Sequence, residues 1–275
     1  TSYSPNIKER KDFSCAVFDA TGQMVAQAAH QPVHLGAMPA SVQAALDKFG
    51  TSLTSNDIII LNDPYMGGTH LPDITMLAPV FHHESLIGYV ANRGHHADVG
   101  GMTPGSLPLS TELYQEGLII PPIKLSDKKT INTEIIDLIC RNSRTPDERR
   151  GDLSAQIASI NIGIRRLEDI TNKYGLNSVT EHMDAILEYS ELITRKTIQN
   201  IPDGTYIAHD FMDDDGLTEE PVKIHVQVTV QGDQIHIDFS GTDAERPGCI
   251  NAPKAVTTSA CLYVGRCIVG EDAPA

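Results

Sequence analysis

The chain has 275 residues, of which 40% are hydrophobic and 21% are charged. Both fractions are typical of a globular protein, and the length suffices for one large domain or two small ones with a buried core. The formal net charge of -15 at pH 7 argues against nucleic acid or anionic membranes as partners, because both bind clustered lysine and arginine.

Two further features bear on the cellular compartment. No apolar run approaches the length of a membrane span, and the first residues include charges but no signal-peptide pattern. The five cysteines form no CxxC pair and no regular framework, which is typical of reduced thiols. We therefore expect a cytoplasmic protein without a membrane span. Because Thr1 is not a natural start, we also expect the chain to be a fragment of a longer protein.

The first part of the chain is predicted to contain two strands and a helix. Residues 12–20 alternate between apolar and polar side chains, which favours a strand that ends in a Thr-Gly turn. Residues 37–49 have the composition of a short helix, and Gly50 is placed to end it. The continuous apolar run at residues 58–61 favours a buried strand.

Two glycine-rich loops follow predicted strands. The first loop is residues 62–73. Residues 74–81 and 86–93 favour the next two strands, joined by a polar turn, and the second glycine-rich loop, residues 94–105, follows them. We expect these strands to lie near one another. Loops that extend from a rigid sheet often carry catalytic groups.

The middle third is predicted to be helical. Residues 145–148 have the pattern of a capping box with proline at the first helical position, and apolar side chains recur at steps of three and four over 153–167. Gly175 is placed to end this helix. Residues 178–181 form a second capping box before another apolar stripe. We expect the two helices to form an antiparallel pair.

After residue 203 the hydrophobic period changes to two. Residues 224–230 and 235–239 alternate on either side of a Gly-Asp turn, which predicts a β-hairpin, and residues 255–268 favour a helix.

These elements predict an α+β fold in three parts. Residues 1–140 would form a mixed β-sheet with the glycine-rich loops, and residues 141–202 the helical pair. Residues 203–275 would form the β-hairpin region and the start of a truncated C-terminal part.

The densest group of potential metal ligands lies in the two glycine-rich loops. His70 and Asp73 are three residues apart across a turn, so both can bind one ion from the same side. A histidine of the second loop, His95 or His96, can complete a set of two imidazoles and one carboxylate. Such a set leaves coordination positions open for water or substrate, as catalytic metal sites require. Zinc, manganese and iron suit these ligands about equally.

Three further residues are candidates for catalysis. His96 and Asp98 could orient a ligand or carry a proton, and His34 could act as a general base or contact the substrate. The structural alternative is a pair of polar glycine turns whose histidines only cap backbone groups. A phosphate-binding loop is disfavoured, because the chain contains neither GxxxxGK[ST] nor a GxGxxG that opens a helix.

Other polar motifs have simpler explanations. Glu112 and Glu116 could supply a carboxylate for acid–base work or a fourth ligand, but glutamates near a turn are more often solvated. Residues 213–216 (Asp-Asp-Asp-Gly) resemble the opening of a calcium loop but lack its glutamate at the twelfth position, so we interpret them as a strand-end turn. No serine lies in a GxSxG motif, which argues against a serine hydrolase.

Eight stretches of the chain share their residues and their order with one known family. They are SPNIKERKDFSCAVFD (4–19), QPVHLGAMP (31–39), NDPYMGGTHLPDITMLAPVF (62–81), RGHHADVGGMTPGSLP (93–108), EGLIIPPIKL (116–125), RTPDERRGDLSAQIA (144–158), DDDGLTEEPVKI (213–224) and DFSGTDAERPGCINAP (238–253). On these stretches the chain resembles the hydantoinase B/oxoprolinase family. The resemblance covers nearly the whole chain, whereas the family's N-terminal segment and a long C-terminal portion have no counterpart here.

The resemblance implies ATP-dependent opening of cyclic amides such as hydantoin or 5-oxoproline. In the family, a separate A-type subunit or domain uses ATP to phosphorylate the lactam or enolate oxygen, and the B-type part completes ring opening or carboxylation. We therefore expect a hydantoinase A-type partner that supplies the ATP step, an oligomeric assembly, and a small cyclic amide as substrate.

The resemblance also implies the metal ligands. In the carboxylase relatives, an HxxD pair and a later histidine bind a metal, and that pattern falls on His70, Asp73 and His95. The expected mechanism is metal-assisted addition of water to a carbonyl activated by phosphorylation. In this mechanism His96 or His34 would carry the proton, and Asp98 would orient a histidine.

Two other functions fit the same residues. A subunit of an ATP-dependent ketone carboxylase needs the same fold and metal, so only a substrate panel that includes bicarbonate separates the two. From a different class, a non-catalytic assembly subunit could use the glycine-rich loops only to dock the A-type partner, and it would then bind no metal.

Overall fold

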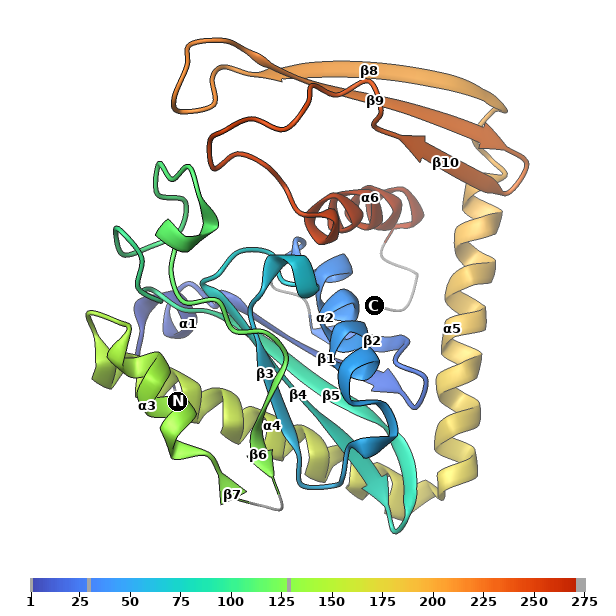
Figure 1. The fold of residues 1–275 in the computed structure, drawn as a ribbon. Coiled ribbons are helices and arrows are strands. Elements are labelled where there is room, and N and C mark those ends of the chain that lie inside the picture. Colours follow the sequence, from blue (N-terminus) through green and yellow to red (C-terminus); the bar gives the residue numbers. More distant parts are fainter. Residues whose placement is uncertain (1, 29–30, 128–129, 271–275) are drawn as a thin grey trace.

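The computed structural model describes residues 2–28, 31–127 and 130–270. Its centre is a seven-stranded sheet in the order β2-β1-β5-β4-β3-β6-β7 (Figure 1). The strands are β1 (Phe13–Asp19), β2 (Met24–Ala28), β3 (Ile58–Leu61), β4 (Asp73–His82), β5 (Ser85–His95), β6 (Ile123–Asp127) and β7 (Thr130–Ile131).

Six α-helices accompany this sheet. They are α1 (Pro5–Lys8), α2 (His34–Phe49), α3 (Thr133–Arg141), α4 (Pro146–Tyr174), α5 (Leu176–Ile198) and α6 (Lys254–Val269) among the described residues, with short 3-10 turns at Gly50–Ser52, Pro64–Met66 and Leu113–Gln115. Helix α4 packs on one face of the sheet and α2 on the other (Figure 1).

Both faces of the central strands are buried, which explains why β3 is an unbroken apolar run. Ile58 and Ile60 belong to the hydrophobic core under α4, whereas Ile59 and Leu61 belong to the core under α2. Successive side chains of a strand point to opposite faces, so a strand covered on both sides needs apolar residues at every position. The sheet is thus the middle layer of three.

A second, three-stranded sheet lies apart from the first. It has the order β10-β9-β8 and consists of β8 (Gly204–Met212), β9 (Val222–Gln231) and β10 (Gln234–Asp238). Figure 1 shows α6 between this sheet and α2. The predicted hairpin at 224–239 is therefore confirmed, and the predicted helix at 255–268 is α6.

The α+β class is confirmed, but the expectation of a mixed sheet is wrong. Every pairing between the described strands is antiparallel. The physical reason is the connections: β4 and β5 are joined by a tight turn, and no helix separates β3 from β4 except the short 3-10 turn at Pro64–Met66. Parallel neighbours need a crossover of a dozen residues or more, usually an α-helix. The division of the chain near residues 140 and 202 stays a prediction.

The expected antiparallel helix pair is also wrong. Only Gly175, with φ of 85°, separates α4 from α5, and Figure 1 shows α5 leaving the end of α4 at a steep angle. A reversal into a helical hairpin takes a loop of about two to five residues. Because α5 begins at Leu176, residues 178–181 lie inside the helix and do not cap it.

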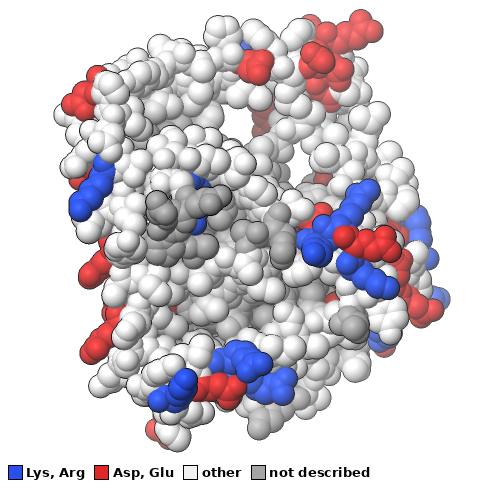
Figure 2. All heavy atoms as spheres, turned by 180° about the vertical axis from the view of Figure 1, so that it is seen from behind, with Lys and Arg blue, Asp and Glu red and all other residues white. Residues whose placement is uncertain are grey.

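One face of the molecule shows how the charged side chains are distributed. On the face shown in Figure 2, basic and acidic side chains are interspersed over a mostly uncharged surface, and the described residues there form no continuous basic stripe. Among the described residues, no helix has both the length and the apolar character needed to cross a bilayer.

Candidate metal centre

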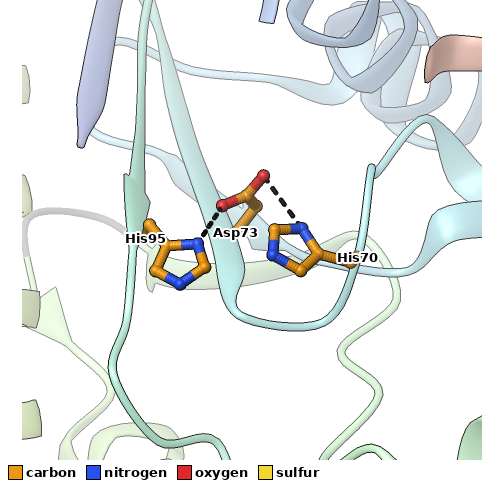
Figure 3. Close-up of side chains that lie close together, drawn as sticks. All are labelled: His70, Asp73 and His95. Carbon is orange, nitrogen blue, oxygen red and sulfur yellow. Dashed lines mark hydrogen bonds and ion pairs between the residues drawn. The ribbon is translucent and has the colours of Figure 1, made fainter. Parts of the chain in front are cut away.

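Two adjacent strands place the central residues of the site. Asp73 is the first residue of β4 and His95 the last residue of β5, and the two are direct partners in the antiparallel ladder. Residues opposite each other in a ladder point to the same face of the sheet. His70 comes from the loop before β4 and closes the group from the other side, as Figure 3 shows.

Both imidazoles contact the same carboxylate. His95 Nδ1 lies 3.1 Å from Asp73 Oδ1, and His70 Nδ1 lies 3.1 Å from Asp73 Oδ2. The centroids of the two rings are 5.0 Å apart. One ligand atom from each residue can be chosen so that all three lie within 4.8 Å of one another. The HxxD pair and the remote histidine are thus brought together as a candidate metal site.

His34 joins this group from helix α2. It is the first residue of α2, is almost fully buried, and its Nε2 lies 3.5 Å from Asp73 Oδ2. Its other ring nitrogen, Nδ1, lies 2.8 Å from Ser14 Oγ on β1. The helix predicted for 37–49 therefore begins three residues earlier than expected, and His34 belongs to it and not to a loop.

The electrostatics of the group favour an ionised carboxylate. Burial alone would raise the pKa of Asp73, but the charge of His70 and the hydrogen bonds from His34, His70 and His95 hold it well below its usual range. Burial lowers the pKa of His95, and the hydrogen bond and charge of Asp73 outweigh that effect, so the pKa of His95 is raised. Asp73 and His95 therefore stabilise each other's charged form.

The loop that carries His70 is held tightly. Gly67 has φ of 87°, and a Cβ there would lie 2.3 Å from the carbonyl carbon of Ala40 in α2. The Asn62 side chain donates to the Leu71 carbonyl at 2.7 Å and accepts from the Ile120 backbone N–H at 2.7 Å. These contacts require a glycine and an amide at those positions and fix the path of the chain into His70.

Thr69 is a member of the site that the sequence analysis missed. Its hydroxyl donates a hydrogen bond to Asp73 Oδ2 and lies 3.3 Å from His70 Nδ1. A threonine adjacent to the HxxD motif was the available signal, because a buried carboxylate needs donors for all its lone pairs.

His96 lies outside this group. Its side chain is fully buried, and its Nε2 lies 2.8 Å from Gln156 Oε1 of α4, whereas His95 faces Asp73. Burial and the charge of Arg149 lower the pKa of His96 to about 4, so its ring is neutral at pH 7. The structure thus brings His95, and not His96, to the HxxD pair, and the role of His96 as a proton carrier stays a prediction.

Asp98 has a different partner from the one expected. Its carboxylate accepts from the Arg144 backbone N–H at 2.6 Å, from Arg144 Nη1 at 3.0 Å and from the Gly100 N–H at 2.9 Å. The expectation that Asp98 orients a histidine is therefore corrected: this carboxylate fixes the second glycine-rich loop to the start of α4.

The remaining candidates also lie elsewhere. Glu116 accepts a hydrogen bond from Ser110 Oγ at 2.8 Å, and Glu112 is exposed. Residues 213–216 follow β8, and Asp215 accepts from the backbone N–H groups of Leu217 and Thr218, which is the predicted strand-end turn.

The residues of the cluster fit a divalent transition metal. An ionised carboxylate and imidazole nitrogens are the donors that zinc, manganese and iron accept. The carboxylate is 2% exposed whereas the His70 side chain is 27% exposed, so the cluster is buried on one side and open on another. Within the described parts of the chain, it is the one set of three or more such side chains close enough to share an ion.

Comparisons with known proteins show which family the chain belongs to. The Hydantoinase B/oxoprolinase family model matches residues 1–275. The chain is 42% identical over its full length to an uncharacterised protein of Methanocaldococcus jannaschii and covers 49% of it. It is 38% identical to 5-oxoprolinase 1 of Arabidopsis thaliana, with 100% of the chain and 24% of that protein covered. It is 34% identical to the putative B-type subunit of a D-/L-hydantoinase from a Pseudomonas species, with 96% and 46% covered.

Two solved structures share the fold. The ATP-dependent caprolactamase of Pseudomonas jessenii superposes with a TM-score of 0.86 at 30% identity, covering 91% of this chain and 43% of that one. A nucleotide-free acetone carboxylase superposes with a TM-score of 0.83 at 21% identity, covering 95% and 37%, and this likeness concerns the fold alone. The chain spans between about a quarter and a half of the length of these relatives. The chain belongs to the hydantoinase B/oxoprolinase family.

Proposed function

We propose that this chain is the metal-binding part of a B-type catalytic subunit that completes the ATP-dependent opening of a cyclic amide. The observation that carries the proposal is the convergence of His70 and His95 on the buried carboxylate of Asp73 in a chain of this family. The names of the relatives support the substrate class. 5-Oxoprolinase, D-/L-hydantoinase and caprolactamase are all named after cyclic amides.

In this proposal His70, Asp73 and His95 hold one divalent transition metal. When bound there, such an ion supplies Lewis-acid chemistry: it polarises a carbonyl group and lowers the pKa of water. Asp73 contributes the negative charge, and Thr69 restricts the rotation of its carboxylate by donating to Oδ2. The partly exposed His70 lies on the side from which a substrate can approach.

His34 is the best-placed proton carrier among the candidates. It lies 3.5 Å from Asp73 Oδ2, and its contact with Ser14 fixes the orientation of its ring. A general base must lie within reach of the reacting group and hold one tautomer, and the hydroxyl of Ser14 can select that tautomer. His96 faces Gln156 instead, on the side of the sheet covered by α4.

The ATP step belongs to a partner in this proposal. An A-type subunit or domain would activate the amide oxygen by phosphorylation, and the B-type site would then receive the activated substrate. The ketone carboxylase alternative has weaker support, because its structural neighbour is 21% identical whereas the caprolactamase is 30% identical.

The test is a substrate panel with the full-length B-type protein and its A-type partner. We expect ATP-dependent ring opening of 5-oxoproline, hydantoin or caprolactam, which consumes ATP only when both subunits are present. His34→Gln should lower turnover by at least about 100-fold and leave metal content unchanged, as expected of a proton carrier. Turnover of acetone that requires bicarbonate, without cyclic amide hydrolysis, would instead establish the carboxylase. No turnover of any substrate, with an intact complex, would favour a docking role.

A further inference from the structure

A buried arginine lies beside the metal centre with no assigned role. Arg93 is on β5, two residues before His95, and its side chain is 0% exposed. Burying a charged guanidinium is costly, and a well-packed apolar side chain of similar volume would stabilise a core at least as well. The role of Arg93 therefore has to be sought in the groups that its guanidinium contacts.

The guanidinium first joins the two strands that carry Asp73 and His95. Arg93 Nε donates to Thr75 Oγ1 at 2.7 Å, and Thr75 is two residues after Asp73 on β4. Arg93 and Thr75 are direct ladder partners, as Asp73 and His95 are. Side chains two residues apart on a strand point to the same face of the sheet. The hydrogen bond between Arg93 and Thr75 therefore joins β4 and β5 two residues away from Asp73 and His95.

The same side chain reaches the loop that carries His70. Arg93 Nη2 lies 3.4 Å from the Gly67 carbonyl, and it donates to Ser41 Oγ at 2.7 Å. The Ser41 hydroxyl in turn donates to the Gly67 carbonyl at 2.8 Å. This carbonyl is three residues before His70, so the arginine and the serine together hold the start of the ligand loop.

A third contact reaches the helix that carries His34. Arg93 Nη2 donates to the Ala37 carbonyl at 3.2 Å, and Ala37 is three residues after His34 in α2. One guanidinium therefore bonds to β4, to the His70 loop and to α2, while its own strand carries His95. Four segments supply a side chain to the cluster: β4, the His70 loop, α2 and β5. The first three accept a hydrogen bond from the Arg93 guanidinium, and β5 contains Arg93.

We propose that Arg93 is the positioning residue of the metal centre, whose guanidinium sets the mutual placement of His70, Asp73, His95 and His34 without binding the metal. This inference rests on the metal-assisted function proposed above. Arg93 also lies close enough to Asp73 for their charges to attract. Outer-shell partners of this kind orient ligands and tune metal affinity.

The test compares Arg93→Met and Arg93→Lys with the wild type in the full-length protein with its partner. Metal affinity is measured by competition with a chelator, and the Co²⁺-loaded protein is examined by visible absorption, which reports ligand geometry. Arg93→Met should weaken metal binding by about tenfold to 100-fold and alter the cobalt spectrum. Arg93→Lys keeps the charge but loses the planar fork, so it should recover only part of the affinity.

Arg149→Met is the matched control. Arg149 is also 0% exposed, but it lies in α4 and pairs with Asp152, on the opposite face of the sheet. Its loss should lower thermal stability while metal affinity and the cobalt spectrum stay those of the wild type. If Arg93→Met does not fold, Thr75→Val and Ser41→Ala each remove one contact of the guanidinium, and each should weaken metal binding severalfold.

The outcomes separate this inference from the proposed function. A wild type that binds no metal contradicts the metal-assisted function and the inference together. Suppose instead that the wild type binds metal, and that Arg93→Met or both single-contact variants bind it within twofold of the wild-type affinity and give the same cobalt spectrum. This result contradicts the inference alone. In that case Arg93 would serve only the fold.

Discussion

Asp73 is the residue on which the proposed metal centre depends, because it is the only carboxylate that both His70 and His95 contact among the described residues. Asp73→Asn keeps the size of the side chain and removes its charge. We expect metal affinity to fall by more than about 100-fold, beyond the usual effect of outer-shell changes. Isothermal titration calorimetry on the chelator-treated protein measures this directly.

Asp98→Asn is the matched control for that variant. Asp98 is also a buried carboxylate and lies in the second glycine-rich loop, but its ion-pair partner is Arg144. Metal affinity should stay within a few-fold of the wild type, while the midpoint of thermal unfolding falls because a buried hydrogen-bonded carboxylate is lost. An equal loss of metal in both variants would mean that the charge of the region matters and not the identity of the ligand.

The raised pKa of His95 predicts how the metal-free protein responds to pH. A histidine whose pKa is higher in the folded state stabilises the fold fully below the unfolded value of 6.5, and this contribution is lost as pH rises through the folded pKa. The stability of chelator-treated wild type, relative to His95→Gln, should therefore be greatest below pH 6.5 and fall as pH rises above that value. Thermal melts of both proteins across this range provide the measurement. A difference that grows with pH would contradict the assignment.

Metal affinity should change in the opposite direction over the same range. Protons and metal compete for the imidazole of His95, so binding should strengthen as pH rises and release protons.

The sequence allowed the grouping of His70, Asp73 and a later histidine to be predicted, but not the residues that surround them, and their role as metal ligands stays a prediction. His70 and Asp73 are close in the chain, so their shared site depends on local geometry alone. The choice between His95 and His96 was open, because it depends on which of two successive residues faces α2 and which faces α4. Arg93 gave no signal, since its partners come together only through the packing of a loop, a strand and a helix.

The contact between α2 and α6 links the C-terminal region to the site. Ser259 Oγ accepts from the Gly36 N–H at 2.9 Å and donates to the Val33 carbonyl at 2.5 Å. A Cβ on Gly36 would lie 2.8 Å from the Ser259 backbone nitrogen. The two helices therefore approach closely at the turn of α2 that begins with His34.

Gly36→Ala should separate these helices and destabilise the protein by about 1–3 kcal/mol, the usual cost of overpacking. Gly265→Ala is the control in α6, because a Cβ at Gly265 would meet nothing within 4 Å, and alanine should stabilise that helix by up to about 1 kcal/mol. Denaturant unfolding of both variants measures the two free energies. A Gly36→Ala protein as stable as the wild type would contradict the close approach.

The strands were predicted more accurately than the relation between helices. The apolar run of β3 and the alternation of β9 and β10 are local patterns, and both the strand and the hairpin were confirmed. The angle between α4 and α5, in contrast, does not depend on a local sequence pattern. It follows from a linker of one residue and from the different neighbours of each helix: α4 packs on β4 and β5, whereas α5 contacts α6 and β10.

The fold of the molecule explains why the site lies where it does. The seven-stranded sheet supplies Asp73 and His95 from two adjacent inner strands, and α2 covers the same face and supplies His34. The α+β class was predicted correctly, yet the sequence did not predict that a separate three-stranded sheet would lie beyond α6. The alternation of apolar and polar residues along a strand does not specify which other layer of the fold the strand packs against.

Metal analysis of the purified full-length protein by plasma mass spectrometry tests the proposed metal centre directly. Wild type would be compared with His70→Ala, His95→Ala and His96→Asn. We predict near-stoichiometric metal in wild type and His96→Asn, and its loss in both alanine variants. Metal retained in His95→Ala, or no metal in wild type after reconstitution, would contradict a metal centre at His70, Asp73 and His95.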